Sequence, residues 1–347
     1  METEIFNVDG ERHHDMLVNT TQPKLSYSPS VNYGEWKSQI KKKFVELSGI
    51  ETIAENVCPL NVQVIKEEEK DGYKQIAFTF DSEKGETVPC YLLIPNTGND
   101  KYPVAITLQG HSTGFHNSVG IVKYDRDKDY QPRGQFAIQA VKNGFIALAI
   151  EQRGMGIRKT YKANRLPNNA CLYASRIASG LGRTLIGERV WDVHKAIDAL
   201  SQFPKCDMEK ILITGNSGGG TASYYAACFD ERIGLSVPSC SFCSYKESIL
   251  SIAHCACNYI PLMYKYFDMQ DLSCMIAPRK LTIVAGKEDE IFPIAGVRKG
   301  YATVKQIYER LGVGKNCRLV ETPKEHWWCV ELVWDTINEE CKKLGWK

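Results

Sequence analysis

The motif G-N-S-G-G at residues 215–219 constrains the fold of this chain more than any other feature. It lies between an apolar run, residues 211–214, and a stretch of helical character, residues 221–228. A serine with glycine two positions before and after it, between a strand and a helix, is typical of a strained turn that raises the hydroxyl above a sheet. The glycines are needed because the chain approaches itself too closely there for a Cβ atom. The pattern predicts that Ser217 is a nucleophile at a helix N-terminus.

A glycine-rich phosphate loop or a plain tight turn would also place several glycines together. No lysine follows the motif in the spacing of a P-loop, and the glycines do not form G-x-G-x-x-G. We therefore favour the nucleophile over both alternatives.

Short apolar strands alternate with helices from residue 104 onward. The expected strands are 104–108, 145–150, 211–214, 235–238, 281–285 and 317–321, and the expected helices are 136–141, 191–200, 221–228, 297–311 and 329–341. Strands that are apolar on both sides belong to parallel sheets buried on both faces. An expected hairpin of residues 73–80 and 88–94 adds antiparallel strands at one edge. The predicted fold class is α/β, with a mostly parallel central sheet, helices on both faces and an antiparallel N-terminal edge.

The chain is expected to divide near residue 70. Residues 1–34 look like an irregular leader and 35–47 like a helix, so 1–70 would form a leader and a helix that packs on the core. Residues 71–347 would form the catalytic domain as a single structural unit. Two long connections, 157–183 and 239–278, are of a length that usually carries function or caps a site.

The charges are nearly balanced, with 43 basic and 41 acidic residues and a formal charge of +2. Nucleic-acid-binding surfaces concentrate Lys and Arg, so we expect no nucleic-acid partner. No apolar run approaches the roughly 18 residues of a membrane-spanning helix, and none follows residues 1–5 as in a signal peptide. We therefore expect no membrane partner, and reduced thiols in the cytoplasm for the 13 cysteines.

A serine hydroxyl needs a general base, and the base needs a group that orients it. In a strand–serine–helix turn of this kind the acid and then the histidine follow the serine along the chain. Asp289 lies in a loop after a short apolar strand, and we choose it over Glu288 and Glu290. His326 lies in the loop after the last expected strand. The predicted catalytic triad is Ser217, Asp289 and His326.

The oxyanion of an acyl-transfer reaction needs two backbone N–H donors. One is expected from Gly218, which follows the nucleophile. The other is expected from His111, in the loop after the strand 104–108. Gln109 in the same loop is expected to support the site or contact the substrate.

Cysteines and aromatic residues near these loops have several interpretations. Trp327 could form an aromatic wall against the substrate or belong to the core, and His254 is assigned to support of the site or substrate contact. Four thiols form a C-x-x-C and a C-x-C motif, which could bind zinc or form a disulfide. Small cysteines can also pack as apolar side chains, and we favour a packed pocket wall. These thiols are Cys240, Cys243, Cys255 and Cys257. We expect no metal and no cofactor.

With these residues placed, the chain resembles the α/β-hydrolase superfamily. Within it, the chain is most similar to acetyl xylan esterase-like proteins related to carbohydrate esterase family seven, which contains acetyl xylan esterases and cephalosporin C deacetylases. The resemblance covers roughly residues 70–347 and rests on the motifs at 151–156, 185–192, 215–219 and 286–293. It implies the α/β-hydrolase fold, a supporting role for Arg153 and a homo-oligomer. The deacetylases have Gln, Gln and Glu where this chain has Met155, Gly218 and Trp327.

The predicted function is that of a serine carboxylic-ester hydrolase without cofactor. Its partner would be a small ester, such as an acetylated saccharide, that is deacetylated through an acyl-enzyme. A prolyl-oligopeptidase-like serine peptidase is a first alternative, although no repeat of propeller-blade size is present. A non-catalytic binding protein that kept the scaffold is a second.

Overall fold

The computed structural model describes residues 9–160 and 170–346. Nine strands in this part of the chain form one sheet in the order β1-β2-β3-β5-β4-β6-β7-β8-β9. Their bounds are β1 Gln63–Lys70, β2 Tyr73–Glu83, β3 Glu86–Pro95, β4 Tyr102–Leu108, β5 Ile146–Ile150, β6 Cys206–Asn216, β7 Ile233–Ser239, β8 Lys280–Gly286 and β9 Cys317–Thr322. The pairs β1–β2, β2–β3 and β3–β5 are antiparallel and all others parallel, which confirms the predicted fold class.

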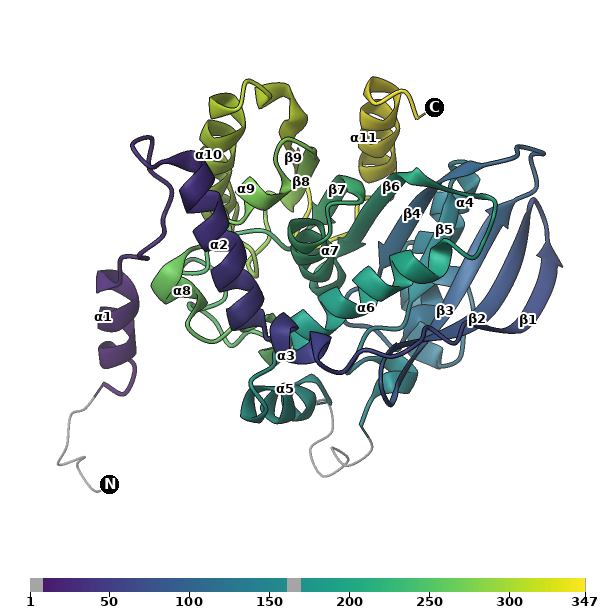
Figure 1. Ribbon diagram of the computed structural model, residues 1–347, viewed down its shortest axis with the longest axis horizontal. Helices are drawn as coiled ribbons and strands as arrows, with labels where there is room; N and C mark the ends of the chain where they lie inside the picture. Colours follow the sequence, from purple (N-terminus) through teal and green to yellow (C-terminus); the bar gives the residue numbers. More distant parts are fainter. Residues whose placement is uncertain (1–8, 161–169, 347) are drawn as a thin grey trace.

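Helices connect the parallel strands. The α-helices are α1 Arg12–Thr20, α2 Tyr33–Ser48, α3 Ile50–Ala54, α4 Phe136–Lys142, α5 Ala170–Gly180, α6 Leu185–Leu200, α7 Gly218–Phe229, α8 Met263–Tyr266, α9 Ser273–Ile276, α10 Ile294–Arg310 and α11 Val330–Lys343. Short 3₁₀ helices lie at η1 Phe115–Val119, η2 Asp125–Tyr130, η3 Gly156–Arg158, η5 Ala256–Asn258 and η6 Gly314–Asn316. Figure 1 shows α6 and α7 lying across the sheet, and α1 standing apart from it near the N-terminus.

Both faces of the central strands are buried, because the side chains of these strands alternate between two cores. In β5, Ile146, Leu148 and Ile150 belong to a core shared with α2, α6, α7 and α10. Ala147 and Ala149 belong to a second core shared with α4 and α11. This burial on both sides explains why the central strands are apolar without alternation.

The elements predicted from residue 73 onward are confirmed, with ends that shift by a few residues. The helix predicted at 35–47 is α2, and the hairpin 73–80/88–94 is β2–β3. The prediction of an irregular leader is wrong for residues 12–20, which form α1. The strand β1 was not predicted, and since it pairs with β2, a division at residue 70 falls inside an antiparallel hairpin.

The two long connections contain short helices within the described residues. The first, 157–183, contains the end of η3 and all of α5, and its residues 161–169 lie outside the described part of the chain. The second, 239–278, contains η5, α8 and α9. Within residues 9–160 and 170–346, no helix combines the length and the apolar character that crossing a bilayer requires.

Candidate active site

Ser217 occupies a strained turn between β6 and α7. Its backbone has φ 55° and ψ −126°, a region that non-glycine residues rarely adopt. The strain is held by hydrogen bonds on both sides: the Ser217 N–H donates to the carbonyl of Ser239 at 2.9 Å, and the Ser217 carbonyl accepts from the N–H of Thr221 at 2.8 Å. The side chain is therefore presented at the N-terminus of α7, as the motif predicts.

The glycines of the motif are required by close approach to β4. A Cβ atom on Gly219 would overlap the carbonyl oxygen of Leu108, and one on Gly215 would overlap that same oxygen and lie 2.7 Å from the carbonyl carbon of Gly219. These neighbours are backbone atoms, at the end of β4 and in the first turn of α7, and cannot rotate away. The turn can thus form only with glycine at both positions.

Asp289 and His326 are joined by a hydrogen bond. His326 Nδ1 donates to Asp289 Oδ2 at 2.9 Å. The other carboxylate oxygen, Oδ1, accepts from the backbone N–H groups of Ile291 at 2.8 Å and Phe292 at 3.0 Å. The ring of Phe292 stacks on the imidazole, with centroids 5.9 Å apart. The carboxylate is buried and doubly anchored, so it can orient the imidazole and stabilise its protonated form.

The neighbouring acids do not share this geometry. Glu288 and Glu290 are exposed, whereas the Asp289 side chain is 1% exposed. Among the three carboxylates of this loop, the structure pairs Asp289 with the imidazole.

The serine and the imidazole project from the same edge of the sheet. Ser217 follows β6, and His326 follows β9, at the carboxyl ends of strands in one parallel array. The loop that carries His326 lies directly on Gly286 at the end of β8, where a Cβ atom would overlap the carbonyl oxygen of Glu325.

His326 Nε2 is buried and has no hydrogen-bond partner among the described residues. This lack of a partner includes Ser217 Oγ, which does not form a hydrogen bond with His326 Nε2 in the described structure. Such bonds are often long in unliganded enzymes and tighten with substrate. Because Nδ1 is occupied by Asp289, Nε2 is the nitrogen left to accept a proton.

The loop after β4 lies over the turn, where the oxyanion donors are expected. A Cβ atom on Gly110 would lie 3.1 Å from Ser217 Cβ. A Cβ atom on Gly218 would lie 2.9 Å from His111 Cε1. Gly218 opens α7, where first-turn N–H groups lack partners within the helix. Gly218 and His111 are thus neighbours at Ser217, and their role as oxyanion donors stays a prediction.

Glu151, at the end of β5, supports this loop and was not singled out from the sequence. It accepts from Gln109 Nε2 at 3.1 Å and from the backbone N–H groups of Phe115 and Ile157 at 3.2 Å. The Gln109 carbonyl in turn accepts from Gln152 Nε2 at 2.7 Å. Gln109 therefore contacts the neighbouring loops of the site. Burial raises the pKa of Glu151 to about 7.

Replacement of Glu151 by glutamine should flatten the dependence of stability on pH. A carboxyl whose folded pKa is raised favours the folded state most at low pH, and this stability is lost as the pH rises from about 4.5 through about 7. The wild-type loss from this group is on the order of 3 kcal/mol. Chemical denaturation of Glu151→Gln between these pH values should show a shallower decline. Part of the decline should remain in the variant, because burial also raises the pKa of Asp271 to about 7.

The control for this series is Glu55→Gln, which changes an exposed carboxylate and should leave the wild-type decline intact. An equal decline in Glu151→Gln and the wild type would contradict the assignment.

Arg153 ties the loop after β5 to α6 and β2. Its Nη2 and Nε lie 2.8 and 3.0 Å from the two oxygens of Asp192, and its Nη1 lies 2.7 Å from Glu83 Oε1. The guanidinium is buried within this ion-pair network. The contacts fit the supporting role that the resemblance implies.

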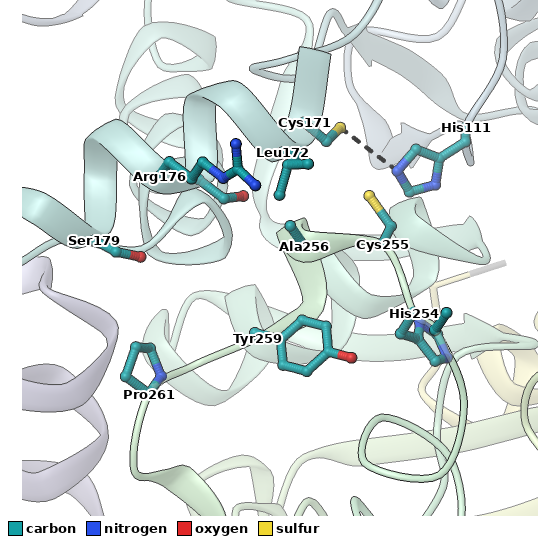
Figure 2. A pocket seen from close by; sticks show the side chains of 12 residues that line it. His111, Cys171, Leu172, Arg176, Ser179, His254, Cys255, Ala256, Tyr259 and Pro261 are labelled. Atoms are coloured by element: carbon teal, nitrogen blue, oxygen red, sulfur yellow. Dashed lines mark hydrogen bonds between the residues drawn. The ribbon is translucent and has the colours of Figure 1, made fainter. Parts of the chain in front are cut away.

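A cavity of about 810 Å³ opens beside the loop after β4. Figure 2 shows His111 and His254 at one end and Tyr259 and Pro261 along one wall. The remaining lining residues are Cys171, Leu172, Ser175, Arg176, Ser179, Ala253, Cys255 and Ala256. His254 lines the cavity while its Nε2 lies 3.2 Å from Ser248 Oγ. The two long connections therefore do form walls beside the candidate site.

The two tryptophans after His326 have different surroundings. Trp327 is 43% exposed, and the guanidinium of Arg133 lies 3.6 Å from its ring centroid. Trp328 is 1% exposed and donates from Nε1 to Gln139 at 3.0 Å, so it belongs to the core.

The structure does not bring the four thiols considered for zinc together. Cys240 lies beside Asp289 and His326, and Cys243 donates to the carbonyl of Pro293 at 3.7 Å. Cys255 and Cys257 lie elsewhere, with His111 and Cys171. The alternative of one zinc site shared by the two motifs is wrong, because Cys240 and Cys257 belong to separate clusters of ligand atoms.

The parallel sheet with its antiparallel edge, and the serine turn at its carboxyl edge, define an α/β-hydrolase. The chain belongs to the Abhydrolase family, whose model matches residues 12–312.

Known relatives are similar over most of their lengths. The protein named "Putative hydrolase YtaP" from Bacillus subtilis (strain 168) is 24% identical over 271 residues, which are 77% of this chain and 87% of that protein. A solved structure described as a "putative acetyl xylan esterase" from Bacteroides fragilis NCTC 9343 superimposes with a TM-score of 0.79 at 16% identity, covering 98% of this chain and 97% of the other. A glucuronoyl esterase from Solibacter usitatus has a TM-score of 0.65 at 16% identity, over 93% and 97% of the two chains. At these identities the structural likeness establishes the fold.

Proposed function

We propose that this protein is a serine carboxylic-ester hydrolase that removes small acyl groups, acetyl above all, from esters such as acetylated saccharides. The observation that carries the proposal is the Asp289–His326 pair, whose unpartnered Nε2 lies at the sheet edge from which Ser217 projects. The names of two structural neighbours, an acetyl xylan esterase and a glucuronoyl esterase, support an ester of a saccharide as substrate.

The reaction proceeds in two halves. His326 Nε2 takes the proton of Ser217 as Oγ attacks the ester carbonyl, and Asp289 stabilises the imidazolium. The N–H groups of Gly218 and His111 hold the oxyanion. The C–O bond to the alcohol breaks, and His326 returns the proton to the departing alcohol. Water then attacks the acyl-enzyme by the same route and releases the acid.

Crowding beside Gly218 favours a small acyl group. A Cβ atom there would already lie 2.9 Å from His111 Cε1 and 3.5 Å from Met155 Cε. Met155 is 2% exposed and therefore firmly packed. An acyl chain that extended along Gly218 would meet these two side chains.

We expect kcat/KM for p-nitrophenyl esters to fall by about tenfold or more from acetyl to octanoyl. Met155→Ala, which removes part of the crowding, should reduce this preference. Assay on acetylated oligosaccharides then tests the alcohol side. A preference for octanoyl in the wild type would contradict the proposal.

The two alternatives make different predictions. A peptidase should cleave a panel of peptide substrates faster than acetyl esters. A non-catalytic binding protein should fail to react with a fluorophosphonate probe, whereas the proposed enzyme should be labelled at Ser217, as peptide mapping of the adduct would show.

A further inference from the structure

Three thiols and one imidazole from distant parts of the chain meet beside the candidate active site. The ligand atoms of His111, Cys171, Cys255 and Cys257 all lie within 4.8 Å of one another. His111 Nε2 is 3.6 Å from Cys171 Sγ and 3.3 Å from Cys257 Sγ. Cys257 Sγ is 3.2 Å from Cys255 Sγ. Figure 2 shows the His111 ring directed at the sulfur of Cys171, with Cys255 beside them.

These separations are close to the edges of a zinc coordination tetrahedron. With Zn–S near 2.3 Å and Zn–N near 2.0–2.1 Å, ligand atoms lie about 3.6 Å apart for nitrogen and sulfur and about 3.8 Å apart for two sulfurs. The distance from His111 Nε2 to Cys171 Sγ, 3.6 Å, matches this edge, and the distance to Cys257 Sγ, 3.3 Å, is slightly shorter. The Cys255–Cys257 pair needs to open by a fraction of an ångström.

A buried cation next to the cluster has no carboxylate partner among the described residues. Arg189 is 1% exposed, and its Nη2 lies 3.4 Å from Cys171 Sγ. Its Nε and Nη2 donate to the carbonyl of Arg153, while Nη1 is buried without a hydrogen-bond partner among the described residues. No carboxylate of the described chain forms an ion pair with it. A buried charge of this kind needs compensation.

A zinc ion with three thiolates would supply that compensation. The three thiols lose their protons when the metal binds, and the neutral imidazole adds no charge. The centre then carries a single negative charge, opposite to that of Arg189. Soft thiolates also select zinc over harder cations.

We propose that His111, Cys171, Cys255 and Cys257 form a structural zinc site. Four protein ligands leave no open coordination position, so the ion does not act on the substrate. Instead it links the loop after β4, through His111, to α5 through Cys171 and to η5 through Cys257. Because His111 adjoins Gly218, the metal would hold the loop on which the second oxyanion donor is expected. This inference concerns metal binding and does not depend on the ester-hydrolase proposal.

The first test is the metal content of the wild-type chain, purified under reducing conditions from zinc-supplemented medium without chelators. Elemental analysis should find about one tightly held zinc per chain. Cobalt bound in its place should show thiolate-to-cobalt charge-transfer bands and the intense visible bands of a tetrahedral site. The absence of zinc, together with failure of the reduced protein to take up zinc or cobalt, would overturn the proposal.

Variants then locate the site. Cys171→Ser and Cys257→Ser should each bind zinc at least tenfold more weakly and melt at a lower temperature. Cys255→Ser, at a half-exposed position, serves if those two fail to fold. Cys58→Ser removes a thiol outside the cluster and should retain the wild-type metal content.

Two further results would refute the assignment. One is zinc content unchanged by all three ligand substitutions. The other is a disulfide between Cys171 and Cys255 or Cys257, found by mass spectrometry of protein alkylated without reduction. Ser217→Ala should keep its zinc whether or not the esterase proposal holds, so the two proposals fail separately.

Discussion

Replacement of Ser217 by alanine is expected to lower kcat for p-nitrophenyl acetate by on the order of 10⁶, to the level of the scaffold without a nucleophile. The effect should be this large because the acyl-enzyme cannot form without Oγ, and the Asp289–His326 pair then has no hydroxyl to activate. Steady-state kinetics on the purified variant measures the loss. A burst of p-nitrophenol in the wild type that vanishes in Ser217→Ala would report the missing intermediate.

The variant must be shown to be folded before its kinetics are read. The turn is held by backbone hydrogen bonds to Ser239 and Thr221 that alanine preserves, so the melting temperature should stay near that of the wild type. Ser251→Ala, which removes an exposed hydroxyl that bonds only within its own turn, is the matched control. Undiminished turnover in Ser217→Ala would end the proposed mechanism.

Asp289→Asn is expected to lower kcat by on the order of 10⁴, as loss of the orienting carboxylate does in serine proteases. The asparagine oxygen would stay on the N–H groups of Ile291 and Phe292, which now contact Oδ1. Its NH₂ group would then face His326 Nδ1 and donate to it. The imidazole would carry its proton on Nε2, the nitrogen that must accept the serine proton, so the variant would hold the wrong tautomer.

The matched controls are Glu288→Gln and Glu290→Gln, which neutralise exposed carboxylates of the same loop. Both should retain kcat within a few-fold, because surface charges contribute little. If either control lost as much activity as Asp289→Asn, the role of the acid would belong to another residue of this loop.

Local patterns predicted the parts of the site that depend on neighbours in the chain. The turn around Ser217 is encoded by two glycines and the flanking strand and helix, and its strained φ follows from them. Asp289 and His326 were found because the carboxyl ends of parallel strands meet at one edge. The choice of Asp289 over its acidic neighbours was made from the sequence, and the structure adds the physical reason, since it buries this carboxylate and leaves Glu288 and Glu290 exposed.

Other features have no local signal. The strand β1 is rich in charge and mostly exposed, so its extended form comes from pairing with β2 and not from an apolar pattern. Asp127 lies in a charged run that suggests a solvated loop, yet it is fully buried and accepts from His116 and two backbone N–H groups.

The sequence by itself determined the α/β order of the elements and the strained serine turn, because periodicity and close approach act over a few residues. Only the tertiary structure decided which thiols lie near His111. Cys171 and Cys257 are separated by 86 positions and reach the loop after β4 from α5 and η5. The reason is physical: ligand geometry depends on distances in space, and spacing along a chain reports those distances only within one local segment.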